Sequence, residues 1–110
     1  MDIRITVDTS GFNFNDVDID EVIQQEIEKT AYMIERGAKA NCPVDTGRLR
    51  GSITTEVGSL QADIGSNVEY AGYVHDGTYK MGARPFLETA AEAEIGGLEE
   101  RIIAAIERLL

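Results

Sequence analysis

The residues able to do chemistry are few, and they centre on one histidine. His75, the only histidine, is followed by Asp76, and such a pair can activate a nucleophile such as Ser66 or Cys42. No serine stands in a nucleophile-elbow motif, and a His-Asp dipeptide is common by chance. One histidine with scattered carboxylates also lacks the ligand spacing of a metal site. We therefore interpret His75 and Asp76 as an ordinary polar turn and expect no catalytic residue, no metal ligand and no cofactor.

The single cysteine limits covalent chemistry further. Cys42 excludes an internal disulfide and any site built from several cysteines. We expect it to be a small, partly buried apolar residue. The glycines fit neither a phosphate-binding loop nor a dinucleotide fingerprint. The N-terminus does not resemble a signal peptide, and no apolar run approaches the ~20 residues that span a bilayer, so we expect a soluble protein made in a reducing compartment.

The charge of the chain is unevenly distributed. The 110 residues are 43% hydrophobic and carry a formal charge of −10, which fits one domain over residues 1–110 and opposes nonspecific binding to nucleic acid or anionic membranes. Residues 1–35 carry −7, residues 36–85 carry +1 and residues 86–110 carry −4. Solvated helix faces are the simplest interpretation of the acidic ends. The alternative is an intracellular adaptor or inhibitor whose acidic surface imitates nucleic acid.

The acidic ends have the spacing of helices. The first helix is predicted over residues 18–41, with Asp18 and Glu21 as a capping box and Pro43 beyond its end. One face of this helix carries its apolar residues, which are Ile19, Ile23, Ile27, Ala31, Ile34 and Ala38.

A second helix is predicted over residues 85–109, with Pro85 in its first turn. Gly96 and Gly97 interrupt it, so we expect either a kink or a close contact with another backbone there. Its apolar stripe consists of Leu87, Ala91, Ile95, Leu98, Ile102, Ile106 and Leu109.

Between the helices the apolar period changes to two. Alternation over 52–57 and 60–65 predicts a hairpin that turns at Gly58-Ser59, with a positive φ at Gly58. Residues 3–7 add another strand, and residues 72–82 read as a short turn or helix followed by a loop or edge strand. The expected fold class is therefore α+β, a small antiparallel sheet (N-terminal strand plus central hairpin) packed with two long helices.

Three blocks in the middle of the chain resemble those of a known family. Residues 42–53 (CPVDTGRLRGSI) are similar to its P-V-D-T-G-x-L-R-x-S-I block, and residues 70–78 (YAGYVHDGT) to Y-A-x-Y-V-[EH]-x-G-T. Residues 80–87 (KMGARPFL) are similar to K-M-x-A-R-P-F-L, although Tyr79 stands where Arg is frequent and Gly82 where Pro is frequent. This is the tail-component family of long-tailed phages and prophages, typified by gene product ten of phage Hong Kong 97.

The resemblance implies a non-enzymatic virion protein that acts in tail completion or head–tail joining. Its partners would be other phage head–tail connector and tail proteins, with no specific nucleic acid and no membrane, and self-assembly into a ring is plausible. It would be made in the host cytoplasm and then enter the virion at the head–tail junction or tail.

The same blocks contain the residues that we expect at a protein interface. Their glycines, Gly47, Gly77 and Gly82, are expected to permit unusual backbone angles. Aromatic and methionine side chains around Arg84 have the composition of an interface centre, except that Phe86 and Tyr70 are expected in the core. The basic residues either bind an acidic neighbouring subunit or pair within the chain with Asp45, Asp63 or Glu69. The predicted partner-interface residues are Asp45, Gly47, Arg48, Arg50, Tyr73, His75, Tyr79, Lys80, Met81 and Arg84.

Overall fold

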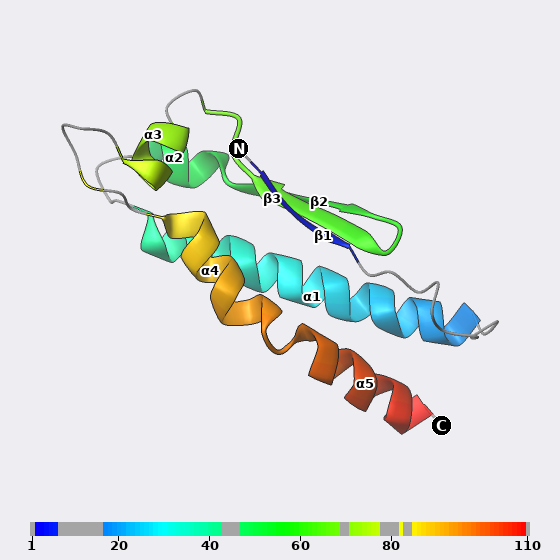
Figure 1. Cartoon of the computed structure of the whole chain (residues 1–110). Helices are drawn as coiled ribbons and strands as arrows, with labels where there is room; N and C mark the ends of the chain where they lie inside the picture. Colours follow the sequence, from blue (N-terminus) through cyan, green and yellow to red (C-terminus); the bar gives the residue numbers. More distant parts are fainter. Residues whose placement is uncertain are drawn as a thin grey trace.

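The computed structural model of the chain describes residues 2–6, 17–42, 47–68, 71–77, 82 and 85–109. They form an elongated molecule of 53 × 21 × 20 Å in which a three-stranded antiparallel sheet lies against a long helix (Figure 1). The strands pair in the order β1-β3-β2, so the expected α+β fold with an N-terminal strand and a central hairpin is confirmed. The elements are β1 (Asp2–Thr6), α1 (Val17–Asn41), α2 (Gly47–Ser52), β2 (Thr54–Gly58), β3 (Gln61–Gly65), α3 (Ala71–Asp76), α4 (Phe86–Ile95) and α5 (Leu98–Leu109).

Helix α1 confirms the first predicted helix almost to the residue. It begins at Val17, so the expected cap Asp18 already lies inside the helix, and the side chain of Asp18 is outside the described part. The predicted face is the buried one, and its residues Ile23, Ile27, Ala31, Ile34 and Ala38 are each at most 3% exposed. These residues pack against the inward side chains of the sheet, which include Ile5, Ala62 and Ile64.

The second predicted helix is two helices, because the chain bends at Gly96 and Gly97. The bend confirms the expected kink, and Gly96 itself keeps a helical φ of −56°. The apolar stripe does not run continuously across the bend. Leu87 and Leu98 are buried, whereas Ile95, at the end of α4, is 40% exposed.

The close approach between helices falls at Gly37 and not at the glycine pair. A Cβ atom added at Gly37 would lie 3.2 Å from the Cβ of Ala90. Helix α4 therefore crosses α1 where both helices carry small residues, and this crossing fixes the start of α4 relative to the sheet.

The hairpin turn is made by Ser59 and Leu60, one residue later than predicted. The positive φ falls on Leu60, at 56°, and not on Gly58, which pairs with Gln61 as the last residue of β2. The cause is a contact with α1: Gln24 Nε2 donates to the Gly58 carbonyl at 2.9 Å, and the Leu60 N–H donates to Gln24 Oε1 at 2.6 Å. The side chain of Leu60 also packs on the core. These contacts offset a backbone strain of about 1–3 kcal/mol for a non-glycine residue at positive φ.

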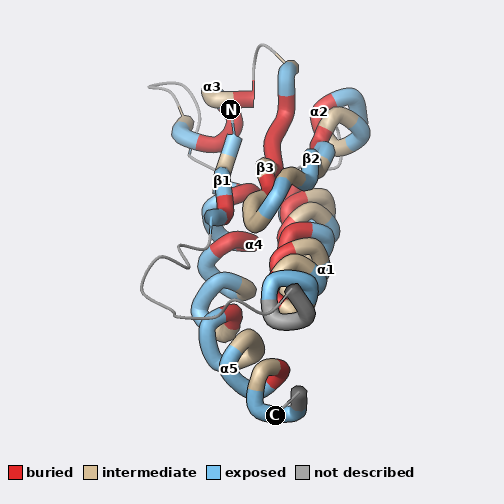
Figure 2. Tube along the Cα trace, turned by 90° about the vertical axis from the view of Figure 1, so that its right-hand side faces the viewer, coloured by how far each residue is buried: buried red, intermediate tan, exposed pale blue. Residues whose placement is uncertain are grey.

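Two short helices, α2 and α3, stand on either side of the chain that leaves β3 (Figure 2). Helix α3 fits the expected short turn or helix, but α2 was not expected, because Gly47 was predicted to adopt an unusual backbone angle and instead begins a helix. Gly82 does not have a positive φ either. Gly77 does, at 80°, and it ends α3 as expected.

Candidate protein–protein interface

The three sequence blocks meet at one end of the molecule. We name this the motif end and define it as α2, α3 and the first turn of α4, next to the C-terminal end of α1 (Figure 1). These segments are far apart in the sequence. Hydrogen bonds between their side chains and backbones hold them together.

Helix α2 is fastened to the end of α1 by Arg50 and Leu49. Arg50 Nη2 donates to the Cys42 carbonyl at 3.1 Å, while Leu49 is completely buried. Cys42 is 3% exposed and its N–H donates to the Ala38 carbonyl at 3.0 Å, which confirms the buried apolar role expected for this cysteine. Arg50 was predicted either to bind an acidic neighbouring subunit or to pair within the chain, and the structure gives it a backbone carbonyl of the chain as a partner.

Two serines connect α2 to the end of β3. The hydroxyls of Ser52 and Ser66 are 2.5 Å apart, and Ser52 Oγ also donates to the Leu49 carbonyl at 2.6 Å. Because a hydroxyl has one proton, Ser66 must donate to Ser52 in this arrangement. Ser66 Oγ in turn accepts from the Val68 N–H at 3.1 Å. Sequence reasoning considered Ser66 only as a nucleophile and did not identify this structural role.

His75 joins α3 to the start of α4. Its Nε2 accepts a hydrogen bond from the Glu88 N–H at 3.2 Å, so the neutral ring donates from Nδ1 to Asp76 Oδ1 at 3.0 Å. The ring also meets Phe86 edge-on with a centroid distance of 5.4 Å. Pro85, the N-cap residue of α4, makes no side-chain cap. His75 therefore caps α4 from another helix, and its geometry is that of a structural residue and not of an exposed base.

The exposed residues of the motif end are those that a partner could reach. Tyr73 is 64% exposed, and Gly47 and Arg48 are also exposed, whereas His75 is only 6% exposed. Phe86 is buried, as expected. Several predicted residues lie outside the described part of the chain, namely Tyr70 and the interface candidates Asp45, Tyr79, Lys80, Met81 and Arg84.

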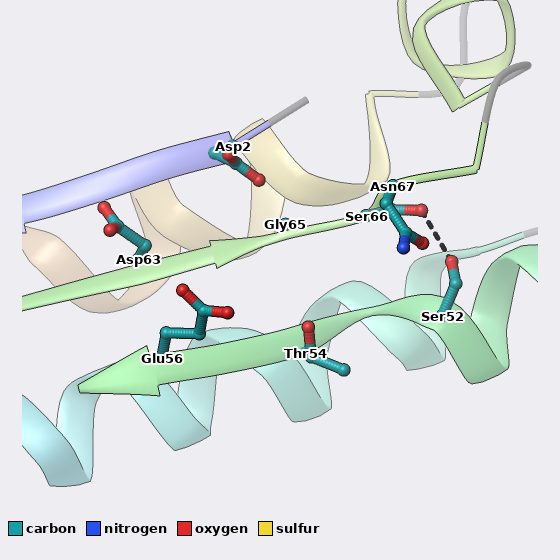
Figure 3. Close-up of a pocket in the computed structure, with 8 residues that line it drawn as sticks. All are labelled: Asp2, Ser52, Thr54, Glu56, Asp63, Gly65, Ser66 and Asn67. Atoms are coloured by element: carbon teal, nitrogen blue, oxygen red, sulfur yellow. Dashed lines mark hydrogen bonds between the residues drawn. The ribbon is translucent and has the colours of Figure 1, made fainter.

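The outer face of the sheet carries a polar hollow of about 470 Å³ beside the motif end (Figure 3). Arg4 and Asp63 form an ion pair of 2.7 Å across the strands, and this contact with the guanidinium holds the pKa of Asp63 below its ordinary value. The partner of Asp63 is therefore Arg4 and none of the basic residues of the blocks. No group of three or more possible metal ligands occurs among the described residues. The residues around the hollow are Asp2, Ser52, Thr54, Glu56, Asp63, Gly65, Ser66 and Asn67.

The motif end combines a closely packed interior with two exposed side chains. Leu49, His75 and Phe86 are buried there, while the aromatic Tyr73 and the basic Arg48 are exposed. None of the helices in the described ranges is long and apolar enough to cross a membrane.

The comparison with protein families identifies the family of the chain. The model of the family described as "Bacteriophage HK97-gp10, putative tail-component" matches residues 12–77. The match covers more than half of the chain, so the chain belongs to this family of phage tail components. It includes the first block and nearly all of the second, while the third block, residues 80–87, lies beyond it. Searches of curated proteins and of solved structures gave no match.

Proposed function

We propose that this protein is a non-enzymatic structural component that completes the tail or joins head to tail, and that the motif end makes its contacts with other phage proteins. The main support is the convergence of separate family blocks at one end. There, Leu49, His75 and Phe86 are buried while Tyr73 is exposed. Residues that only maintained the fold would not require an exposed tyrosine on α3.

The proposal places the protein in the host cytoplasm during synthesis and in the virion after assembly. Its partners are phage head–tail connector and tail proteins, and further copies of the chain. The family is one of tail components, which favours this function over that of an acidic adaptor imitating nucleic acid.

The test is complementation of a phage that lacks this gene with the variant Tyr73→Ala. Tyr73 is 64% exposed, so its truncation should change the free energy of unfolding by no more than about 0.5 kcal/mol. We expect a large loss of infectious particles, with free heads and free tails visible by electron microscopy.

The matched control is Ile103→Ala, which truncates a large apolar side chain that is 49% exposed on α5, away from the motif end. This variant should complement like the wild type. A normal titre and normal particles from Tyr73→Ala would refute the role of the motif end.

A further inference from the structure

The outer edge of strand β2 is open. Strand β2 is the last strand in the order β1-β3-β2, and α4 and α5 lie on the other flank of α1, toward β1 (Figure 2). The two-residue turn makes Gly58 and Gln61 a hydrogen-bonded pair, so the pairs at Glu56 and Thr54 are hydrogen-bonded as well. The N–H and C=O groups of Thr55 and Val57 therefore point away from β3, toward a position that no described strand occupies.

This edge lacks the usual protection against pairing. The sequence of β2, Thr-Thr-Glu-Val-Gly, has no proline, no lysine and no bulge, and its β-branched residues favour an extended strand. The edge also borders exposed apolar surface. Val57 is 38% exposed, and Tyr32, on the adjacent side of α1, is 52% exposed. Thr55 Oγ1 donates to Glu35 Oε1 at 3.3 Å, which places this side of α1 directly beside β2.

The charge on the outer face of the edge is negative. Glu56 stands opposite Asp63 in the register, and Asp63 already has Arg4 as its partner on the far side. Glu56 has no ion-pair partner within the described part of the chain. A cation on an added strand beside Glu56 would form a second cross-strand ion pair, next to that of Arg4 and Asp63.

One segment of the chain has matching chemistry. Residues 77–87 contain no acidic residue and two cations, Lys80 and Arg84. In an extended conformation, the side chains of Lys80 and Arg84 would share one face and those of Tyr79, Met81 and Ala83 the other. The apolar face would lie toward Val57 and Tyr32, and the cationic face would lie beside Glu56. Seven residues, 78–84, span about 23 Å, which exceeds the length of β2.

We infer that residues 78–84 of a second copy of this chain pair with the outer edge of β2 and place Lys80 beside Glu56. The same chain is a poor donor because α3 and α4, which flank the segment, lie on the β1 side (Figure 2). Going out and back, the segment reaches only about 14 Å. Crossing from the β1 side to a fourth strand position beyond β2 takes about the same distance, so no residues would be left to run along β2. The contact joins two different surfaces, as a ring requires, and the inference rests on the proposed function as an assembling tail component.

The test is sedimentation of the full-length chain from micromolar to millimolar concentration, with variants on both surfaces. Val57→Pro removes an N–H that β3 does not use, and edge strands tolerate proline in such positions. Glu56→Lys and Lys80→Glu each place like charges together. Each single variant should weaken self-association at least about tenfold, and circular dichroism should show that it remains folded. The control is Glu107→Lys on α5, which should associate like the wild type.

Mixing separates a second copy from the chain's own segment. In an equimolar mixture of Glu56→Lys and Lys80→Glu, each chain again meets an opposite charge on the other, so association should return, as it should in the double variant. A chain that stays monomeric at millimolar concentration overturns the inference, as does association unaffected by Val57→Pro and both charge variants. A mixture that fails to associate also overturns it. The complementation result with Tyr73→Ala decides the proposed function independently.

Discussion

The cap that His75 provides for α4 gives the sharpest prediction about stability. In His75→Leu the side chain has a similar volume and remains apolar enough for burial, but the Glu88 N–H loses its acceptor. Loss of a helix cap costs about 0.5–2 kcal/mol, and loss of the edge-on contact with Phe86 about 0.5–1.5 kcal/mol. We expect the free energy of unfolding to fall by about 1–3 kcal/mol, which corresponds to a decrease in Tm of roughly 5–15 °C for a chain of this size.

The assay is urea unfolding together with amide hydrogen exchange at Glu88. His75→Gln keeps an acceptor and should lose less stability than His75→Leu, although leucine is the more favourable residue to bury. Tyr73→Ala, on the exposed side of the same helix, should change the free energy of unfolding by no more than about 0.5 kcal/mol. The reasoning is refuted if His75→Leu is as stable as the wild type, or if the Glu88 amide exchanges equally slowly in both.

Three further predictions test contacts outside the cap. Gln24→Ala removes both hydrogen bonds to the hairpin turn and should lower the free energy of unfolding by about 2 kcal/mol, while the exposed neighbour Gln25→Ala should leave it unchanged in urea unfolding. Arg101 Nη2 donates to the Thr30 hydroxyl of α1 at 2.8 Å and to the Glu94 carbonyl at the end of α4 at 3.1 Å. Arg101→Met should therefore lower the free energy of unfolding by about 1.5–3 kcal/mol and speed amide exchange in α5. The control Arg108→Met should do neither. The arginine of β1 lowers the pKa of Asp63 below 3.8, so this carboxylate stabilises the fold above that pH and ceases to do so as the pH falls through its folded-state pKa. Asp63→Asn should therefore be less stable than the wild type at neutral pH and equal to it in strong acid, as measured by urea unfolding at both.

Long periodic segments were predictable from the sequence. Helix α1 and strand β3 follow from apolar spacing, because one face of each is buried and the spacing records that burial. The glycine pair marked the bend between α4 and α5 for a similar reason, since two adjacent residues of poor helix propensity weaken a helix wherever they occur.

Features set by tertiary contacts were not predictable. The turn moved to Leu60 because Gln24, distant in the sequence, binds both sides of it. The apolar spacing of α1 does not indicate the contact at Gly37, whose missing side chain makes room for Ala90. Helix α2 has six residues, too few for a helical period to be recognisable. In each case the decisive partner is far away along the chain.

The same limit explains why His75 was grouped with the partner-interface residues. The block that this chain resembles allows either Glu or His at this position, and these residues differ in charge and shape but both end in a hydrogen-bond acceptor. In the structure that acceptor serves the backbone of α4, 13 residues along the chain, where Pro85 supplies no side-chain cap. A requirement for an acceptor at the start of α4 accounts for both residue types without a partner protein. Residues of one short block thus differ in their surroundings: His75 holds the motif end together, and the exposed Tyr73 on the same helix is the residue that we propose for contact with other proteins.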